Sequence, residues 1–222
     1  KEHVMIVSTL VLLVFIPLYP KLPLFDVVHT WVYVRIEDFI VLFVLFFWGL
    51  LVWRREITLR TPLTLPIFTF WIIGLIATVH GILLVFPSIG DAYPSVAFLS
   101  FLRRMEYMSL FFVAFAAMKE KRFLPLVTVV LIISLLGVAV YGIGQKYLSF
   151  PAFLTMNEEF AKGVPIQLSS LSRVSSTFGG HYDLAAYLVL VLPIIFSMVF
   201  GIRSWLWKGF LLGTSLLGFI VL

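Results

Sequence analysis

The chain has 222 residues, of which 62% are hydrophobic and 12% are charged, and its formal net charge is +5. A soluble domain carries about 25% charged residues, so this composition excludes a water-soluble globular protein and indicates an integral membrane protein. Cysteine is absent, which also excludes disulfides, thiolate metal sites and cysteine nucleophiles. The basic residues are spread along the chain, so the positive charge does not indicate a nucleic-acid partner.

Apolar segments follow one another along the whole chain, most of them near the length of about 20 residues that a spanning helix needs. We therefore predict an all-α, polytopic transmembrane helix bundle with about seven helices, forming a single transmembrane domain over residues 1–222. The second segment is expected to begin early, near Trp31. Gly209 and Gly213 in the seventh predict close helix packing. Because the chain stops inside an apolar run, we expect it to be a fragment truncated at its C-terminus. The segments cover residues 4–19, 39–53, 63–86, 94–118, 123–147, 184–202 and 205–222.

The distribution of lysine and arginine predicts the orientation of the helices, because cytoplasmic loops retain basic residues. Basic residues gather after the second, fourth and sixth segments and are sparser in the other connections. We therefore predict a cytoplasmic N-terminus and an outer position for residues 148–183, the one long connection. Its many apolar side chains predict that it lies on the membrane surface, with a short interfacial helix near residues 157–162. The residues that set the orientation are Arg54, Arg55, Arg60, Lys119, Lys121, Arg122, Arg203 and Lys208.

The fourth segment carries charged residues about a third of the way along its length, where ionisable groups in a membrane are costly and often functional. Arg103 and Glu106 are three residues apart and share one face of a helix. We predict that they form an ion pair, which leaves Arg104 available to a substrate. The alternative is that the group is purely structural and faces the bundle interior.

A second polar group joins the long connection to the sixth segment, in the sequence RVSSTFGGHYD over residues 173–183. His181 and Asp183 are expected near the first turn of the helix, where an aspartate suits the macrodipole and can serve as an N-cap. Capping accounts for Asp183 but leaves Arg173 and the neighbouring hydroxyl residues unexplained. An arginine beside hydroxyls and free helix amides suits a phosphate or pyrophosphate, so we predict such a site here.

A third polar group lies at the predicted outer end of the second segment, where Arg35, Glu37 and Asp38 follow Asp26 and His29. Two carboxylates at an outer surface could bind a divalent metal or act as a base. The interpretation that we favour is that Arg35 and one of the carboxylates neutralise each other. Sequence motifs for nucleotide phosphates, for zinc and for a serine nucleophile are absent.

The second polar group carries a resemblance to a known family. Residues 173–188 have the sequence RVSSTFGGHYDLAAYL, which resembles the RxSGTFGxxNxLAxYL stretch of the O-antigen ligase and O-antigen polymerase family. The sequences VRIEDF at 34–39 and RRMEY at 103–107 are also similar to the N-terminal half of that family. Ser176 replaces a glycine that is usual there, and residues 181–183 replace the common Pro-Asn. The resemblance covers most of this chain but only the first part of a family member.

The resemblance implies a membrane glycosyltransferase of the GT-C kind. Such an enzyme takes a glycan from a polyprenyl-pyrophosphate carrier at the outer face of the bacterial inner membrane. It passes the glycan to a lipid, a growing polysaccharide or a protein, and we expect no metal or other cofactor. The expected partners are therefore the lipid-linked glycan, its acceptor and the membrane lipids, with no nucleic acid.

On this expectation the pyrophosphate is held mainly by Arg173, which stabilises its charge while an acceptor hydroxyl attacks the anomeric carbon. His181 and Asp183 are expected to shape the entrance to the site. The family's catalytic base is expected beyond Leu222, in a later outer loop. The full set of substrate-binding candidates is Arg173, Arg103, Arg104, His181, Asp183 and Arg35.

Two alternatives to this function stay open. In the first, the chain is a transporter or flippase, and the same arginines bind a lipid-linked or anionic substrate without turning it over. In the second, the chain is still a glycosyltransferase, but its site lies at Asp26, Glu37 and Asp38. A long polar outer loop with arginine and histidine beyond Leu222 is the feature that would favour the ligase and polymerase interpretation.

Overall fold

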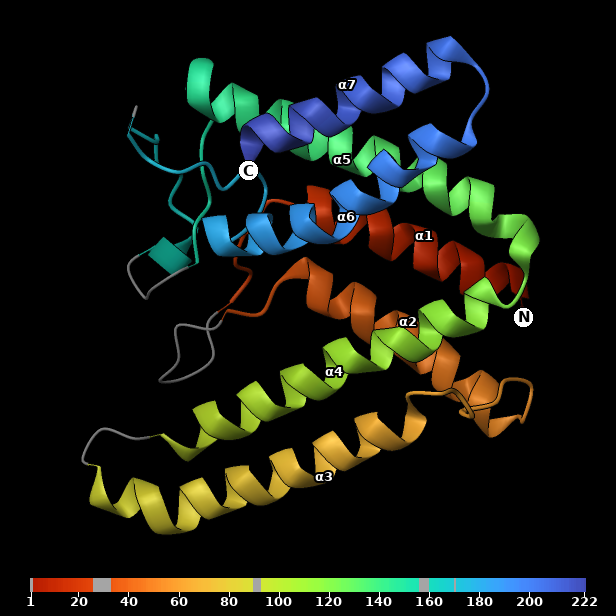
Figure 1. Ribbon diagram of the computed structural model, residues 1–222. Coiled ribbons are helices and arrows are strands. Elements are labelled where there is room, and N and C mark those ends of the chain that lie inside the picture. The colour runs from red at the N-terminus through yellow and green to blue at the C-terminus, as the bar shows by residue number, and fades with distance from the viewer. Residues whose placement is uncertain (1, 26–32, 90–92, 156–159, 170) are drawn as a thin grey trace. The chain divides into compact units, whose positions relative to one another are not determined.

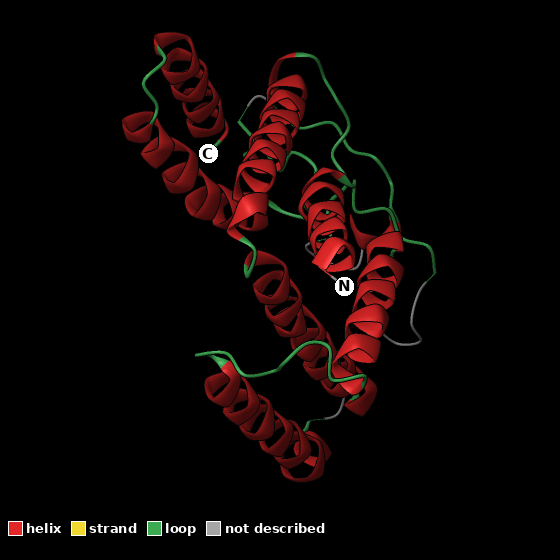
Figure 2. Cartoon of the chain, turned by 90° about the vertical axis from the view of Figure 1, so that its right-hand side faces the viewer, coloured by secondary structure: helices red, strands yellow, loops and turns green. Residues whose placement is uncertain are grey.

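The computed structural model describes residues 2–25, 33–89, 93–155, 160–169 and 171–222. Within these residues the chain is helical, with two isolated antiparallel bridges and no longer strand (Figure 1, Figure 2). The prediction of an all-α helical bundle is confirmed. The described helices are α1 (Glu2–Leu18), α2 (Ile36–Trp53), α3 (Thr64–His80), α4 (Pro94–Met118), α5 (Leu124–Tyr147), α6 (His181–Gly201) and α7 (Trp205–Val221).

Several helices have the length and composition of membrane spans. Four helical segments of the described chain are long and apolar enough to cross a membrane, and α1 and α7 are apolar but shorter. One of the four continues past α3 through a π-helical turn and a 3-10 turn. α4 is 25 residues long and carries the charged group predicted to be functional. The chain is therefore a multi-pass membrane protein. The four long segments are Ile36–Trp53, Thr64–Ser88, Lys121–Tyr147 and His181–Gly201.

α2 begins at Ile36, later than the predicted start near Trp31, which lies outside the described residues. The backbone of Val34 exchanges hydrogen bonds of 2.9 and 3.0 Å with residues 24–25. This antiparallel bridge holds the chain extended as far as Arg35, so the helix starts only after it. The two carboxylates that follow Ile36 therefore lie in the first turn of α2, whereas Arg35 precedes it.

The contacts within the chain divide it into two compact units. The first unit contains most of α2 together with α3 and α4, and the second contains α5, α6 and α7. The helices α1 and α2 each contribute to both units. The first unit comprises Lys1–Thr9, Val27–Thr30 and Asp38–Lys121, and the second comprises Leu10–Asp26, Trp31–Glu37 and Arg122–Leu222.

In the first unit, α2, α3 and α4 meet around the buried ring of Phe112 on α4. Trp48 of α2 stacks on this ring with 5.8 Å between centroids, and Trp71 of α3 approaches it at 6.4 Å. Farther along α4, Phe101 packs against Gly74 of α3, where an added Cβ would lie 3.1 Å from the ring. Aromatic packing therefore joins the three helices.

α2 and α4 run in the same direction, and two contacts fix how far one is shifted along the other. Asp38 pairs with Arg103 at 2.9 Å, and Trp48 stacks on Phe112. In both pairs the α4 residue follows its α2 partner by almost the same number of residues, so one nearly constant offset relates positions on the two helices. The last residues of α2 and α4 therefore lie at nearly the same level. Residues 94–100 of α4 therefore extend about 10 Å beyond the start of α2. Figure 1 shows α3 and α4 continuing past that point.

In the second unit, α5, α6 and α7 pack around a core of buried aliphatic side chains, and α1 joins them through α5. Ser134 of α5 donates its hydroxyl hydrogen to the carbonyl of Leu13 in α1 (2.9 Å). Gly137 leaves room for Leu18, whose Cδ2 would lie 2.6 Å from an added Cβ. The core includes Leu135, Val138, Ala139, Leu184, Leu188, Ile195 and Leu211.

Close packing of α7 depends on Gly218 rather than on the glycine pair predicted from the sequence. An added Cβ at Gly209 or Gly213 would meet nothing within 4 Å, so the prediction of close packing there is wrong. At Gly218 an added Cβ would lie 2.7 Å from Leu192 Cδ2 and 3.3 Å from Leu135 Cδ1. This glycine brings α7 into contact with α5 and α6.

We expect Gly218→Val to destabilise the protein more than Gly213→Val does. Both substitutions change helix propensity by the same amount, but only valine at 218 displaces Leu192 and Leu135. Such overpacking costs about 1–3 kcal/mol. The free energy of unfolding of each purified variant in detergent measures the difference. Equal destabilisation by the two valines would show that packing at Gly218 is not the controlling factor.

Candidate functional site

The connection from α5 to α6 is folded onto helix ends in the second unit. Gln145, which is buried near the end of α5, accepts the backbone N–H of Ser176 at 2.7 Å. Its amide donates to the carbonyls of Ser176 and Pro151, at 2.8 and 3.1 Å. Ala152 and Ile166 exchange backbone hydrogen bonds of 2.8 and 3.0 Å. The single side chain of Gln145 thus fixes the backbone at both ends of the connection.

The middle of the connection contains part of the predicted interfacial helix. Phe160–Lys162 forms a 3-10 turn, and residues 157–159 lie outside the described part of the chain. Gly163 follows with a φ of 75°, a left-handed conformation that glycine adopts without steric cost. An added Cβ there would lie 2.5 Å from Pro23 Cδ. The turn therefore packs against the connection between α1 and α2.

The hydroxyl residues that follow Arg173 are used inside the protein. Ser176 and Thr177 are 1% and 7% exposed. The Ser176 hydroxyl donates to the carbonyl of Val138 on α5 at 2.7 Å, and the Thr177 hydroxyl donates to the carbonyl of Pro17 in α1. These two hydroxyls join the connection to α5 and to α1, so the prediction that they bind a phosphate beside Arg173 is wrong.

Ser176 has a φ of 52°, in the left-handed region that L-residues other than glycine rarely occupy. This conformation costs a non-glycine residue about 1–2 kcal/mol. The hydrogen bond of its side chain to Val138 and the two bonds of its backbone to Gln145 hold Ser176 in place. A glycine would adopt this conformation without the steric cost.

We expect Ser176→Ala to be less stable than Ser176→Gly, by about 1 kcal/mol. Both variants lose the hydroxyl bond to Val138, which contributes about 1 kcal/mol. Alanine keeps the steric cost of the left-handed backbone, whereas glycine removes it. Unfolding titrations of the two purified variants beside the parent chain measure the order. An alanine variant as stable as the glycine variant would contradict this explanation.

Arg173 is exposed and lies between two hollows of the second unit. On one side it lines a hollow of about 220 Å³ together with Lys146 and Ser172. On the other side it lines a hollow of about 330 Å³ together with His181 and Tyr182. Two cationic side chains therefore border the same surface, which is an arrangement that suits an anionic ligand.

No carboxylate of the described residues lies within ion-pair distance of Arg173. Glu158 and Glu159, the rival partners suggested by the sequence, lie outside the described residues. The Lys146 ammonium lies 3.5 Å from the carbonyl of Ser172, which places it beside the residue before Arg173. Sequence reasoning missed Lys146, although a lysine in the last turn of a predicted helix next to the long connection was the available signal.

The start of α6 differs from the predicted capping arrangement. Gly180, in an extended conformation, occupies the N-cap position, and Asp183 lies within the first turn. The prediction that Asp183 caps the helix is therefore wrong, and its charge faces solvent at the positive end of the helix macrodipole. The ring of His181 lies 4.1 Å from that of Tyr182, centroid to centroid. His181 lines the hollow beside Arg173, and Asp183 is not among the lining residues.

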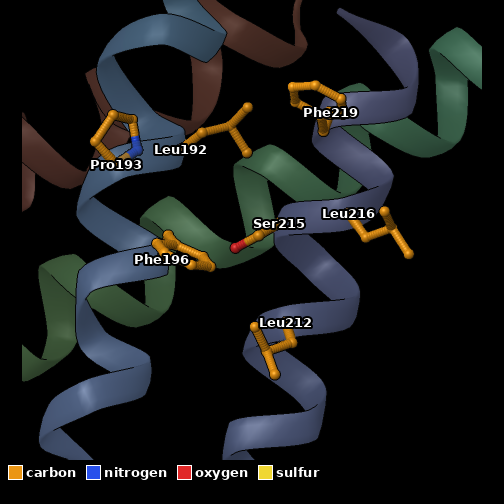
Figure 3. Close-up of a pocket in the computed structure, with 7 residues that line it drawn as sticks. All are labelled: Leu192, Pro193, Phe196, Leu212, Ser215, Leu216 and Phe219. Carbon is orange, nitrogen blue, oxygen red and sulfur yellow. The ribbon is translucent and has the colours of Figure 1, made fainter.

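An apolar groove of about 600 Å³ lies between α6 and α7. Figure 3 shows the side chains of both helices lining it, with the hydroxyl of Ser215 directed toward α6. Phe219 is one helical turn before Leu222, which lines both hollows beside Arg173. The groove therefore begins close to the cationic surface and follows α7 away from it. Its lining residues are Leu192, Pro193, Phe196, Leu212, Ser215, Leu216 and Phe219.

The acidic residues at the start of α2 are engaged in ion pairs. Buried Glu37 pairs with Lys21 and, at 3.0 Å, with Arg35. Burial, and next the negative charge of Glu37, raise the pKa of Tyr19, which follows the end of α1. The neutralisation of Glu37 by Arg35 agrees with the interpretation favoured from the sequence. It also makes Arg35 a structural partner of Glu37 rather than an open substrate ligand.

The alternative site at the start of α2 receives no support from this arrangement. Among the described residues, no group of three or more His, Asp or Glu side chains is placed to hold a metal ion. Asp26 and His29 lie outside the described residues. The remaining carboxylate of the group, Asp38, is bound to Arg103.

Arg103 forms its ion pair with Asp38 of α2, at 2.9 Å, rather than with Glu106 of its own helix. The prediction of an Arg103–Glu106 pair is therefore wrong. Spacing along one helix favours a neighbour three residues away, but the packing of α2 beside α4 presents a carboxylate at the same level. Arg104 is exposed, and no described carboxylate lies within ion-pair distance of it.

A double-mutant cycle should show coupling between Asp38 and Arg103. We expect Asp38→Asn and Arg103→Gln each to destabilise the protein, because each leaves a partly buried charge without its partner. Their effects should be non-additive, with a coupling of about 1–3 kcal/mol. The matched cycle of Arg103→Gln with Glu106→Gln should give a smaller coupling. Unfolding free energies measure both cycles, and a larger coupling to Glu106 would contradict the observed pair.

The candidate residues belong to different units. Arg173 and His181 lie together in the second unit, beside Lys146, whereas Arg103 and Arg104 lie in the first unit. Comparison of the chain with protein-family models, with curated proteins and with solved structures finds no match.

Proposed function

We propose that this chain is the membrane part of an enzyme that transfers a glycan from a polyprenyl-pyrophosphate carrier at the outer face of the bacterial inner membrane. The observation that carries the proposal is the exposed guanidinium of Arg173, which lies between two hollows without a described carboxylate partner. An apolar groove starts close beside it. A pyrophosphate on a long isoprenoid chain combines the two chemistries that these features would bind.

The pyrophosphate fits the cationic surface of the second unit. Arg173 presents a planar fork of donors that can bind two phosphate oxygens at once, and Lys146 adds a point charge. His181 lines the same surface and can donate a further hydrogen bond. The loop that carries Arg173 is anchored by Gln145, so the guanidinium extends from a fixed backbone.

The isoprenoid chain fits the groove between α6 and α7. Its lining is almost wholly apolar, and both helices have the composition of membrane helices. Because Phe219 lies one turn from Leu222, a carrier with its pyrophosphate at Arg173 can place its first isoprene units in the groove. Because the carrier already lies in an apolar bilayer, van der Waals packing against these side chains supplies the contact.

The proposed reaction is attack of an acceptor hydroxyl on the anomeric carbon of the glycan. A new bond forms between the acceptor oxygen and that carbon, and the bond from the carbon to the pyrophosphate oxygen breaks. Negative charge develops on the departing pyrophosphate, and Arg173 stabilises it. The proton of the acceptor hydroxyl passes to a general base.

The outer location follows from the alternation of basic residues and agrees with the arrangement within each unit. In the first unit, Glu2, Ile57 and Lys119 line one hollow, so the N-terminus and two basic connections lie at one end. In the second unit, the bond of Thr177 to Pro17 brings the long connection to the end of α1. We assign the first of these ends to the cytoplasm and the long connection to the outer face.

We expect Arg173→Ala to weaken binding of the pyrophosphate carrier by about 10-fold or more, because a charge-assisted contact contributes about 1.5–3 kcal/mol. Arg173→Lys should recover only part of the binding, since an ammonium lacks the fork geometry. Thermal stabilisation of the full-length protein by undecaprenyl pyrophosphate, compared with undecaprenol, measures it. Lys162→Ala, an exposed substitution on the same connection, is the matched control.

Glycan transfer in cells separates the enzyme from the transporter. Loss of glycan on the acceptor in the Arg173 variants, with normal amounts of protein in the membrane, supports the proposal. Movement of the lipid-linked glycan across vesicles of the purified protein, with no transfer to any acceptor, would favour the flippase. Full binding and transfer by Arg173→Ala would remove Arg173 from the site.

A further inference from the structure

The shift of α4 along α2 places the charged group of the first unit at a definite depth in a bilayer. The two helices end at nearly the same level, at Trp53 and Met118, and basic residues follow both ends directly. That level therefore marks one boundary of the hydrocarbon core. Measured from there, a core of about 30 Å reaches about 20 residues along α4, to the vicinity of Phe98.

The apolar part of α2 ends before the opposite boundary, because Glu37 and Asp38 occupy the first turn of the helix. Its apolar stretch, residues 39–53, covers about 22 Å. Asp38 and Arg103 therefore lie about 7 Å inside the hydrocarbon core, and the first turns of α4 rise past them to the boundary. A charge at this depth needs either a partner in the protein or a contact with the headgroup region.

Arg103 and Arg104 meet this requirement differently. Arg103 binds Asp38. Arg104 is exposed, and no carboxylate of the described residues is within ion-pair distance. On the face of α4 that carries Arg104, Ser100 is exposed one turn nearer the boundary, and Tyr107 is 48% exposed one turn deeper. Arg104 thus lies on an exposed face of α4, at a depth from which an arginine side chain can extend to the headgroups.

We propose that Arg104 binds the phosphate of a phospholipid in the leaflet at the α3–α4 turn. The guanidinium extends along α4 past Ser100 toward the boundary and donates two hydrogen bonds to phosphate oxygens. The charge of Arg104 is neutralised by the lipid and not by the protein. This assignment is independent of the carrier site at Arg173, and it takes Arg104 out of the set of substrate-binding residues.

The test uses the purified full chain in a neutral detergent, with dioleoylphosphatidylglycerol added as the probe. Dioleoylglycerol, which has the same acyl chains and no phosphate, is the comparison lipid. We expect the phospholipid to raise the melting temperature more than the diacylglycerol does. Arg104→Gln should lose most of that phosphate-dependent shift, and Arg104→Lys should keep part of it. Arg54→Gln, at the opposite end of α2, should keep all of it.

An unchanged phosphate-dependent shift in Arg104→Gln would overturn the proposal. So would a shift that depends on Arg104 with farnesyl pyrophosphate but is absent with the phospholipid, because Arg104 would then belong to a carrier site. Depth gives a second measure, since the chain has no cysteine of its own. A spin label on Arg104→Cys should lie about 9 Å below one on Phe98→Cys in a bilayer. Equal depths, or a label in water at position 104, would contradict the geometry.

Discussion

The side-chain amide of Gln145 is the interaction on which the candidate carrier site depends. It uses both its oxygen and its nitrogen on the backbone of Ser176, and the nitrogen also reaches Pro151. A buried backbone amide without a partner costs about 1–3 kcal/mol, so these bonds confine the chain to one path. Because Arg173 is three residues from Ser176, the same bonds limit where its guanidinium can reach. Hydroxyl and glycine residues around it serve this anchoring and leave the charged groups to face outward.

Charged side chains in this protein either pair within the chain or, in our proposals, bind a ligand from outside it. At the start of α2, each carboxylate is bound by at least one cation, and these groups hold helices together. Arg173 and Arg104 have no such partner among the described carboxylates, and both are exposed. Membrane interiors penalise unpaired charge, so the depth of Arg104 implies a ligand from outside the chain. Arg173 lies on the connection from α5 to α6, where its planar donors suit an anionic ligand. Phosphates supply that ligand in both of our assignments, on a lipid carrier in one and on a bilayer lipid in the other.

The helices could be predicted from the sequence because apolar length is a local property, and the limits of α4 to α7 lie within a few residues of those expected. Most partners of the polar residues could not, because they come from distant parts of the chain. The pair of Arg35 with Glu37, two residues apart, is an exception. Arg103 has a carboxylate three residues away, yet it binds one 65 residues away on another helix. The spacing of Gly209 and Gly213 in α7 is similarly ambiguous, because it does not show which face of the helix packs against another helix.

The bond between Thr177 and Pro17 has a consequence for how the protein is made. Its two partners are 160 residues apart, and ribosomes add about 5–20 residues per second. The end of α1 therefore spends roughly 10–30 seconds in the membrane before Thr177 exists. The side-chain amide of Gln145 likewise has no bond to Ser176 until Ser176 has been synthesised, but this interval is shorter. During this interval the nascent chain carries unsatisfied polar groups at helix ends, where insertion factors or quality-control proteases can recognise them. Faults in this anchoring should therefore appear first as lost protein during biogenesis.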